Sequence, residues 1–514
     1  MAHPLLVGAP EPETRPYDVV IIGSGMSGLS SAVILAKEGK RVLVLEQHYR
    51  PGGFLHRFYR KGGIEFDVGF HYVGGIEKGQ VLGAYLDYMG VRDRLKFLPL
   101  DPEGYDDLAY PGVDFVVPAG EERYKARLLD KFPAERAAIE RYFIDWRAIV
   151  DGFAFYRLRV EQDMHHADRW MSMALGGYLT GIGCSPALAA VLEGQNPLYG
   201  VEPTRAPVGL HALVTDSFLQ NPYALQGGGD ALARAMVERI RELGGDVKMR
   251  RRVSEILVDD NREVRGVKTD RGETFFAPLI VSCAHPKTTV RLLPDHVLRP
   301  GFRRRILGME DGPATLSAFI TTDVDLSDYG RRNYYQFESL NLDSMYHNVD
   351  RPHEFVFVTV PTAREGRNRA GLHQVIALGF LDWARVAKWA DTSTGKRPED
   401  YEAFKAAQAE DMMRLVYKRL PVLRGHVVGM EAATPLTNRD YAATEAGAAY
   451  GINHTIDQSG RYGLRPRTRV GGLYMTGQSV LMPGVCGVTI SAFHTCSVIL
   501  GSEYLMQKVI HAAA

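Results

Sequence analysis

The feature that most constrains the fold of this chain is a group of three glycines near its N-terminus. Residues 23–28 read Gly-Ser-Gly-Met-Ser-Gly and match the pattern G-x-G-x-x-G. The apolar run YDVVII at residues 17–22 precedes them, and residues 29–39 continue with helical spacing up to a glycine. A second β-branched run at residues 41–45 ends at Glu46. Strand, glycine turn, helix, strand and acid in this order predict a βαβ unit that binds a dinucleotide.

Each position of this motif has a physical role in dinucleotide binding. Gly23 permits the tight turn, Gly25 removes a side chain that would block the pyrophosphate, and Gly28 lets the helix approach the strand. The helix N-terminus offers free N–H groups to phosphate oxygens, and an acid at the end of the next strand accepts hydrogen bonds from ribose hydroxyls. The predicted cofactor-binding residues of this unit also include Ser24, Met26, Ser27, Glu46 and Gln47.

Further glycines indicate that something long lies beside this backbone. Gly52 and Gly53 follow the βαβ unit and permit the chain to pass close to a ligand, although glycine clusters are more often ordinary loops. Near the C-terminus, an expected strand at residues 473–475 reaches Gly477, and residues 484–489 then open a helix-like stretch. A helix that begins in this way is suited to hold a negatively charged group.

These residues resemble a known family. Residues 17–53 followed by GIEFDVG (63–69) resemble the flavin region of the phytoene desaturase, carotenoid isomerase and retinol saturase group of FAD-dependent oxidoreductases. The stretch FDVGFHYVGG (66–75) is closest to the retinol saturase and carotenoid isomerase branch. Blocks near the C-terminus, among them AYGINHTIDQ (449–458) and GLYMTGQSVLMPGVCGV (472–488), resemble the same branch in the same order.

The resemblance implies the cofactor FAD and an α/β fold. That fold has a Rossmann-type FAD-binding domain of the glutathione-reductase-like class and a discontinuous α+β substrate domain. A flexible arm is expected at residues 1–16. The FAD-binding domain is then expected at residues 17–80, 226–295 and 435–514, and the substrate-binding domain at residues 81–225, which read as helix-rich, and 296–434.

The resemblance also assigns further cofactor contacts. Val253 would lie near the adenine through its backbone, and the C-terminal block would be the second half of the flavin site. Many flavoproteins of this kind have an acid after the C-terminal glycine, whereas this chain has Gln478, and Ser479 stands where retinol saturase-like members have an acid. The contacts that the resemblance implies in this block are those of Gly477, Gln478, Gly487, Val488 and Thr489.

Flavin chemistry requires few protein side chains, because the cofactor carries the electrons and the protein supplies position and exclusion of water. His71 and Tyr72 are the candidates to face the flavin ring and exchange a proton with a substrate carbon, and a packing role for His71 is the alternative. No histidine has partners at metal-ligand spacing, so no metal is expected. Four aromatic residues could either line an apolar substrate tunnel or pack in the core, namely Tyr199, Phe218, Tyr223 and Phe319.

Composition limits the classes of partner. Lysine plus arginine equals aspartate plus glutamate, 61 against 61, so no global field attracts nucleic acid, and Arg250–Arg252 are interpreted as solvated turns. Four cysteines without a CxxC pair favour a reducing, cytoplasmic compartment. The most apolar stretch, residues 171–192, is broken by glycines and a proline. Spanning of a membrane is therefore not expected, whereas peripheral attachment to one stays compatible with the sequence.

Together these observations predict an FAD-dependent oxidoreductase that acts on C=C bonds of a polyene or isoprenoid lipid. Saturation, desaturation and cis-trans isomerisation all remain open, and net redox chemistry would require an external electron donor or acceptor. A flavin amine oxidase is one alternative, since that superfamily has the same N-terminal motif. A non-catalytic lipid-binding carrier of the same fold is the other.

Overall fold

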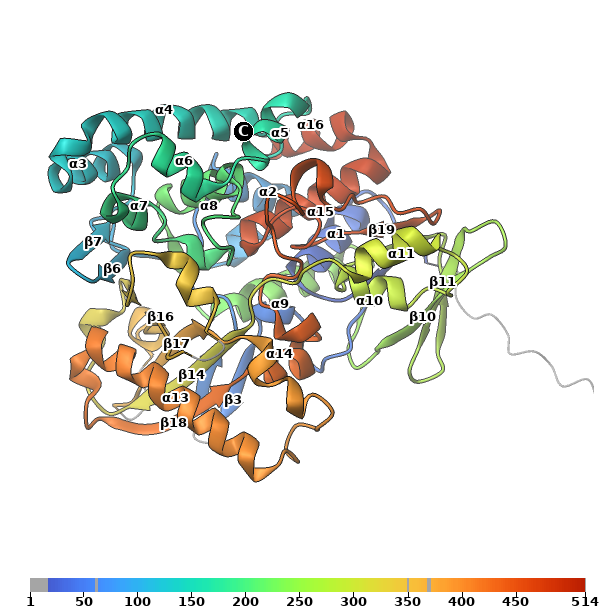
Figure 1. Cartoon of the computed structure of the whole chain (residues 1–514). Coiled ribbons are helices and arrows are strands. Elements are labelled where there is room, and N and C mark those ends of the chain that lie inside the picture. The colour runs from blue at the N-terminus through green and yellow to red at the C-terminus, as the bar shows by residue number, and fades with distance from the viewer. Residues whose placement is uncertain (1–16, 61–62, 349–350, 368–370, 514) are drawn as a thin grey trace, which may run out of the picture.

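The structure is a computed structural model that describes residues 17–60, 63–348, 351–367 and 371–513 (Figure 1). The flexible arm expected at residues 1–16 lies outside the described residues. Two large β-sheets organise the described part of the chain, with helices packed between and around them.

The first sheet is parallel and contains the predicted βαβ unit. Its strand order is β19-β13-β1-β2-β9, and each neighbouring pair is parallel. Its central strands are buried on both faces, as their unbroken apolar sequence predicts. This sheet confirms the Rossmann-type part of the predicted fold. The strands are β1 (Val19–Ile22), β2 (Val42–Leu45), β9 (Asp246–Lys248), β13 (Leu279–Ser282) and β19 (Leu473–Met475).

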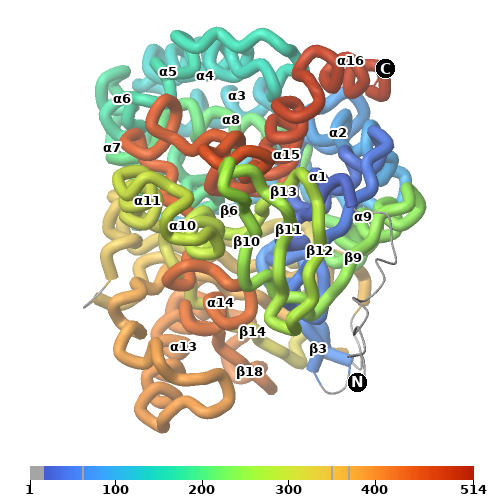
Figure 2. The backbone as a smooth tube through the Cα atoms, turned by 90° about the vertical axis from the view of Figure 1, so that its right-hand side faces the viewer, coloured from blue at the N-terminus to red at the C-terminus, as the bar shows by residue number. Residues whose placement is uncertain are grey.

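Alternate residues of the first sheet pack against two different layers. Val19 and Ile21 belong to the largest core cluster, together with helices that cover one face of the sheet. Val20 and Ile22 belong to a separate cluster formed with a small antiparallel sheet and two short helices. Figure 2 shows α1 and α15 close together although they are far apart in sequence. These elements are α1 (Met26–Lys37), α9 (Gly228–Glu242), α15 (Gly484–Leu500), β10 (Val253–Val258), β11 (Val264–Thr269), β12 (Thr274–Phe276), α10 (Pro286–Arg291) and α11 (Pro300–Leu307).

The second sheet has seven strands in the order β18-β14-β17-β16-β15-β6-β7. Every pair is antiparallel except β15 with β6. The long helix α13 packs on one face through an apolar cluster of its own. The elements are β6 (Asp106–Tyr110), β7 (Val113–Val117), β14 (Thr315–Thr322), β15 (Asn333–Phe337), β16 (Phe355–Thr359), β17 (His373–Phe380), β18 (Val427–Ala433) and α13 (Glu399–Arg419).

Residues 81–225 are helix-rich, as the sequence predicts, but they also contain the hairpin β6–β7. Its two strands extend the second sheet, and β6 pairs with β15, which lies more than 200 residues later in the chain. The sequence contains a hairpin pattern here, because apolar and polar residues alternate in DDLAY and VDFVV on either side of a Pro-Gly turn. In the structure, Gly112 of this turn has a φ of +79°. Two shorter strands, β5 (Phe97–Pro99) and β8 (Tyr223–Leu225), pair with each other in the same segment.

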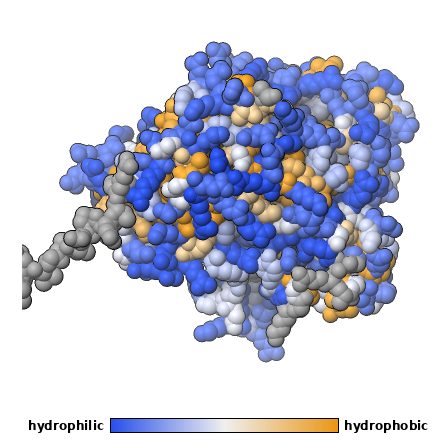
Figure 3. All heavy atoms as spheres, turned by 180° about the vertical axis from the view of Figure 1, so that it is seen from behind, coloured by the Kyte–Doolittle hydropathy of each residue, from blue (hydrophilic) through white to orange (hydrophobic). Residues whose placement is uncertain are grey.

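The remaining helices form a layer at the top of Figure 1. Residues 171–192 are divided there among three short helices, and no helix within the described residues is long and apolar enough to cross a membrane. On the face drawn in Figure 3, hydrophilic residues predominate and apolar residues gather in small groups between them. The helices of this layer are α2 (Val81–Met89), α3 (Glu121–Lys131), α4 (Arg136–Gly152), α5 (Met164–Met171), α6 (Leu175–Gly181), α7 (Pro186–Leu192), α8 (Val208–Leu219) and α16 (Ser502–Ala513).

Three smaller elements complete the part of the fold that positions the site. A two-stranded hairpin leads from the glycine loop into the stretch that carries His71. A short helix lies between β16 and β17, and another follows β18. These elements are β3 (Arg57–Arg60), β4 (Ile64–Asp67), α12 (Pro361–Glu365) and α14 (Pro435–Ala442).

Candidate flavin and substrate site

A cavity of about 460 Å³ reaches from the first sheet to the second. At one end it is lined by the glycine loop after β1 and by the start of α15. At the other end it is lined by aromatic and aliphatic side chains of the second sheet and of α8, among them Leu213, Phe218, Phe355, Phe357 and Leu378. One end thus offers backbone N–H groups and glycines, whereas the other offers an apolar surface.

The glycine loop has the geometry that its sequence predicts. Gly23 has a φ of +94°, a backbone angle that residues with a side chain rarely adopt. A Cβ at Gly28 would lie 2.2 Å from the carbonyl oxygen of Gly23, so only glycine permits this packing. Helix α1 begins at Met26, and no side chain among the described residues caps its N-terminus. The N–H groups of its first turn therefore lack intrahelical partners and lie beside the cavity.

Glu46 fixes the position of this loop. Its Oε2 accepts hydrogen bonds from the backbone N–H and the hydroxyl of Ser24, at 2.8 and 2.6 Å. Its Oε1 accepts a hydrogen bond from the backbone N–H of His48 at 2.7 Å. Glu46 also lines the cavity, so its carboxylate joins the end of β2 to the turn after β1.

The second glycine pair lies against the first loop. The backbone N–H of Gly52 donates to the carbonyl of Ser24 at 3.0 Å, and a Cβ at Gly53 would lie 3.4 Å from the Cα of Gly25. Both glycines line the cavity and both have positive φ. Two stretches of backbone thus run side by side where a ligand can approach them closely.

Arg252 is exposed, as expected for a solvated turn, and Arg251 is partly exposed; both also line the cavity beside Val253. The backbone N–H of Arg251 donates to the carbonyl of Glu46 at 2.8 Å, which draws the turn toward the end of β2. No local pattern in the sequence indicates this contact, since it depends on the pairing of β2 with β9.

The C-terminal block forms the opposite wall of the cavity. The amide of Gln478 donates to the carbonyl of Ala449 at 3.2 Å, and the hydroxyl of Ser479 accepts from the backbone N–H of Ile452 at 3.1 Å. These two bonds connect the turn at residues 477–479 to the stretch AYGIN at residues 449–453. Helix α15 follows from Gly484, and its N-terminus has no side-chain cap among the described residues.

Most of the residues predicted to bind the cofactor line this one cavity, although they come from three distant parts of the chain. Three predicted residues do not line it. The Ser24 hydroxyl points to Glu46, Gly28 packs against Gly23, and the Thr489 hydroxyl donates to the carbonyl of Val485 in its own helix. The residues that line it are Gly23, Gly25, Met26, Ser27, Glu46, Gln47, Gly52, Gly53, Val253, Gly477, Gln478, Gly487 and Val488.

His71 lies at the junction between the two ends of the cavity. Its ring is 5.3 Å from the ring of Phe357, and neither ring nitrogen has a hydrogen-bond partner within the described residues. Burial, together with the nearby charge of Arg364, lowers the pKa of His71 to about 3. The imidazole is therefore neutral at physiological pH, and it has one donor and one acceptor without a partner in the described structure.

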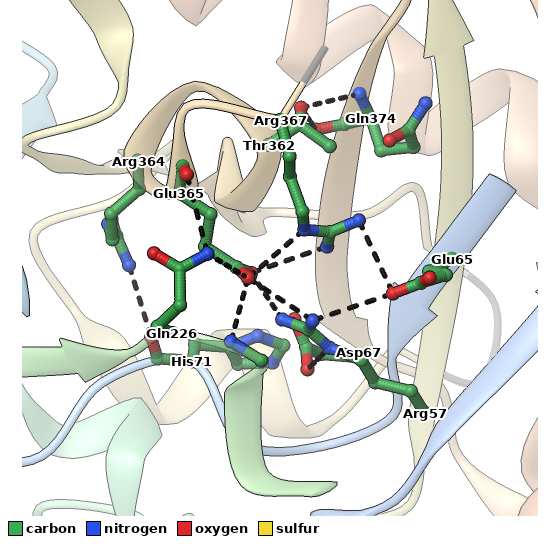
Figure 4. Close-up of polar contacts among 11 residues, drawn as sticks. Arg57, Glu65, Asp67, His71, Gln226, Thr362, Arg364, Glu365, Arg367 and Gln374 are labelled. Atoms are coloured by element: carbon green, nitrogen blue, oxygen red, sulfur yellow. Dashed lines mark hydrogen bonds and ion pairs between the residues drawn. The ribbon is translucent and has the colours of Figure 1, made fainter. Parts of the chain in front are cut away.

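Arg364 holds the backbone of His71 in place. Its Nη1 donates to the carbonyl of His71 at 3.1 Å (Figure 4). Its Nη2 donates to Oδ1 of Asn333 at 3.0 Å. Burial lowers the pKa of Arg364 to about 10, so the guanidinium remains charged. A buried cation thus connects the stretch after β4 with strand β15.

A cluster of buried charges lies beside this contact (Figure 4). Arg57 of β3 pairs with Asp67 of β4 and with Glu365 at the end of α12. Glu365 also accepts from the backbone N–H of Gly227, at the start of α9, at 2.8 Å, and pairs with Arg367 at 3.0 Å. The cluster therefore joins the hairpin that precedes His71 to elements of both sheets.

Tyr72 belongs to a buried network of hydrogen bonds. Its hydroxyl lies 2.8 Å from Oδ2 of Asp106 and 2.8 Å from the hydroxyl of Tyr335. Tyr72 and Tyr335 line the cavity, whereas Asp106 lies behind them. Sequence reasoning missed Asp106 and Tyr335, because their strands β6 and β15 become neighbours only through the parallel pairing in the second sheet.

The tunnel candidates fall mostly in the core. Of the four, only Phe218 lines the cavity within the described residues. The hydroxyl of Tyr199 lies 3.1 Å from Nδ1 of His211, and Phe319 packs against Phe58 and Phe66. These residues therefore stabilise the fold, and the apolar wall comes from other strands.

The residues around the polar end of the cavity fit a dinucleotide such as FAD. Two uncapped helix N-termini, those of α1 and α15, face one cavity and supply N–H groups for anionic groups. A Cβ at Gly25 would lie 3.3 Å from Sγ of Cys283, so a side chain at this position would crowd the wall that the motif keeps open. Glu46 stands at the end of β2, where ribose hydroxyls are bound in this class of site.

Comparison with known proteins agrees with this geometry. A family model described as flavin containing amine oxidoreductase matches residues 26–365. The all-trans-retinol 13,14-reductase of Rattus norvegicus is 31% identical over 527 residues, which cover 94% of this chain and 85% of that protein. The chloroplastic prolycopene isomerase of Daucus carota is 24% identical over 519 residues, which cover 93% of this chain and 79% of that protein.

A solved structure has the same fold. An oxidoreductase from Methanosarcina mazei superimposes with a TM-score of 0.65 at 15% identity, covering 94% of this chain and 99% of that one. The predicted fold class, cofactor and family resemblance are confirmed. The chain belongs to the flavin containing amine oxidoreductase family, in the branch of the retinol 13,14-reductases and prolycopene isomerases, and it is an FAD-dependent oxidoreductase.

Proposed function

We propose that this protein uses FAD to saturate one C=C bond of a retinoid- or carotenoid-like polyene. The single observation that carries the proposal is the continuous cavity, which has a dinucleotide-binding end at the first sheet and an aromatic, aliphatic end at the second. The relatives named as retinol 13,14-reductase and prolycopene isomerase support a polyene as the substrate.

The residues of the polar end would hold FAD in an extended form. The N-terminus of α1 would bind the pyrophosphate, Glu46 would bind the ribose, and Val253 would lie beside the adenine. The positive end of α15 would face the part of the flavin ring that becomes negatively charged on reduction. When bound, FAD supplies the hydride or accepts it.

The residues of the apolar end would hold the substrate chain. Phe355, Phe357 and Leu378 offer a surface without charge, on which a polyene is stabilised by removal of its apolar area from water, at roughly 25 cal/mol per Å². His71 and Tyr72 lie where the two ends meet, and they are candidates to exchange a proton with the substrate.

The test is an anaerobic incubation of FAD-loaded protein, oxidised and reduced, with retinoids, carotenoids and unsaturated fatty acids, followed by product mass. With the reduced protein, the polyene product is expected to carry two hydrogens more than the substrate. A product with two hydrogens fewer, formed by the oxidised protein, would assign a desaturase, and a product of equal mass but different geometry would assign an isomerase. Bleaching of the oxidised flavin by amines but not by polyenes would overturn the proposal in favour of an amine oxidase.

Saturation consumes two electrons, so turnover would require an external electron donor. Dithionite serves as that donor in the test, so the result does not depend on which donor the protein uses in the cell.

Protein that takes up no FAD would support a lipid carrier instead. Membrane attachment is tested separately by co-sedimentation with neutral vesicles, since an apolar substrate partitions from water into a lipid phase.

A further inference from the structure

We propose that Asp106, Tyr72 and Tyr335 form a proton relay that delivers a proton to a substrate carbon in the cavity. The proposal rests on the proposed function, because saturation of a C=C bond requires one proton for each hydride. It assigns a role to Asp106 and Tyr335, neither of which is identified by any sequence motif.

The relay is a continuous chain of short hydrogen bonds. Oδ2 of Asp106 lies 2.8 Å from the Tyr72 hydroxyl, and this hydroxyl lies 2.8 Å from that of Tyr335. Both tyrosines line the cavity next to Phe357, and their rings belong to one aromatic group with it. A proton can therefore pass from the buried carboxyl to the cavity wall in two steps, each over the length of one hydrogen bond.

The protein holds the carboxyl of Asp106 in a fixed orientation. Oδ1 accepts from the amide of Asn333 at 2.9 Å, and Oδ2 accepts from the amide of Gln195 at 3.0 Å. Asn333 is itself oriented by Arg364, which donates to its Oδ1 at 3.0 Å. The Gln195 amide also donates to the hydroxyl of Tyr105 at 3.0 Å. Asp106 therefore acts through Tyr72, and its partners leave that hydroxyl as the exit for its proton.

The groups that face Asp106 set its titration. Burial raises the pKa of Asp106 to about 6, while hydrogen bonds from Asn333, Gln195 and Tyr72 and the charge of Arg364 oppose this rise. The other ionisable group beside it is Tyr105, and burial raises the pKa values of all three neighbouring tyrosines well above the usual range. The carboxyl is thus the group of this network that exchanges a proton near neutral pH.

The protonation of Asp106 determines the direction of the chain. When Asp106 is ionised, Tyr335 donates to Tyr72 and Tyr72 donates to the carboxylate. When Asp106 is protonated, the carboxyl donates to Tyr72 and Tyr72 donates to Tyr335, so the Tyr335 hydroxyl no longer donates to Tyr72, and its proton is available to a group bound in the cavity that this residue lines. The relay therefore faces the substrate only in its protonated state.

The proton step balances with a hydride that reduced flavin supplies. One carbon of the C=C bond takes the hydride with both electrons, and its neighbour takes the Tyr335 proton. The Tyr72 proton moves to Tyr335, and the Asp106 proton moves to Tyr72, which leaves a carboxylate at Asp106. Water returns this proton before the next turnover. The bonds broken are three O–H bonds, the C=C π bond and the bond that holds the hydride on its donor, and the bonds formed are two O–H and two C–H bonds; the donor is oxidised by two electrons and the polyene is reduced by two.

The first test uses the flavin-free protein, so it does not depend on the proposed function. Infrared difference spectra in D2O are recorded between pH 5 and pH 8. A carboxylic C=O band with a midpoint near pH 6 is expected in the wild type and in Asp107→Asn, and it is lost in Asp106→Asn. The band is expected to shift in Tyr72→Phe, which removes the hydrogen-bond partner. A spectrum without a band specific to Asp106 would overturn the relay.

The second test uses the FAD-loaded, reduced protein with the polyene that the wild type saturates. Tyr335→Phe is expected to lower kcat at least ~100-fold, the effect of losing a positioned acid, with polyene Kd within about twofold. Tyr110→Phe is the matched control, since Tyr110 is a buried tyrosine whose hydroxyl donates to the carbonyl of Ala190, away from the cavity. If Tyr335→Phe retained the wild-type kcat, the relay would be wrong even though saturation itself stood.

Discussion

The guanidinium of Arg57 donates to both carboxylate oxygens of Asp67, with 2.7 Å from Nε to Oδ1 and 3.0 Å from Nη2 to Oδ2. Both side chains are almost fully buried, and Glu365 of α12 contacts the same guanidinium. The pair thus joins the two strands of the hairpin before His71, and Glu365 links this hairpin to α12, which connects two strands of the second sheet. A change at Arg57 is expected to affect stability and the site together.

Arg57→Met should destabilise the protein by about 3–5 kcal/mol, because it leaves two buried carboxylates without their main cation. Chemical denaturation measures this change. Arg60→Met is the matched control on the same strand: Arg60 pairs with Glu431 on the surface, where such pairs contribute about 0–1 kcal/mol. Equal losses for the two variants would contradict the importance of burial.

Gly25→Val should weaken FAD binding while the fold is retained. A branched side chain at this position would start with a Cβ 3.3 Å from Sγ of Cys283 and would crowd the N-terminus of α1. An affinity loss of at least ~10-fold, equivalent to ~1.4 kcal/mol, is expected from flavin absorbance and fluorescence titration. Gly177→Ala in α6, where a Cβ meets nothing within 4 Å, should bind FAD like the wild type.

His71→Leu should leave the flavin-free protein as stable as the wild type or more stable by up to ~2 kcal/mol, because both ring nitrogens are buried without partners in the described structure. The same variant should lose activity if His71 serves the reaction, since function often retains a residue that costs stability. His211→Leu is the contrast. Its ring nitrogens bond the hydroxyls of Tyr142 and Tyr199, so its loss should destabilise the protein by about 1–3 kcal/mol.

The glycine loop shows what local sequence can predict. Gly23 and Gly28 are required by backbone geometry within one βαβ unit, so the local sequence is sufficient to predict this loop. The C-terminal wall was predicted only through a family resemblance, since no local rule brings Gly477 back to Gly25. Asp106 and Tyr335 were missed because no local feature distinguishes them, and only the register of β6 against β15 places them together.

Asp106 should make the stability of the protein depend on pH in a defined direction. Burial raises its pKa from 3.8 to about 6, so the folded state binds this proton more tightly than the unfolded chain does. The resulting stabilisation is complete below pH 3.8 and is lost as the pH rises through about 6. At about 1.4 kcal/mol per pH unit of pKa difference, the wild type should lose about 2.5 kcal/mol relative to Asp106→Asn between pH 4 and pH 7. Urea denaturation across this range measures the difference, with Asp107→Asn as the control for loss of one carboxylate on the same strand. A difference that is independent of pH would show that Asp106 titrates as an ordinary carboxyl, and a difference that changes in the opposite direction would show that folding lowers its pKa; either result would contradict the prediction.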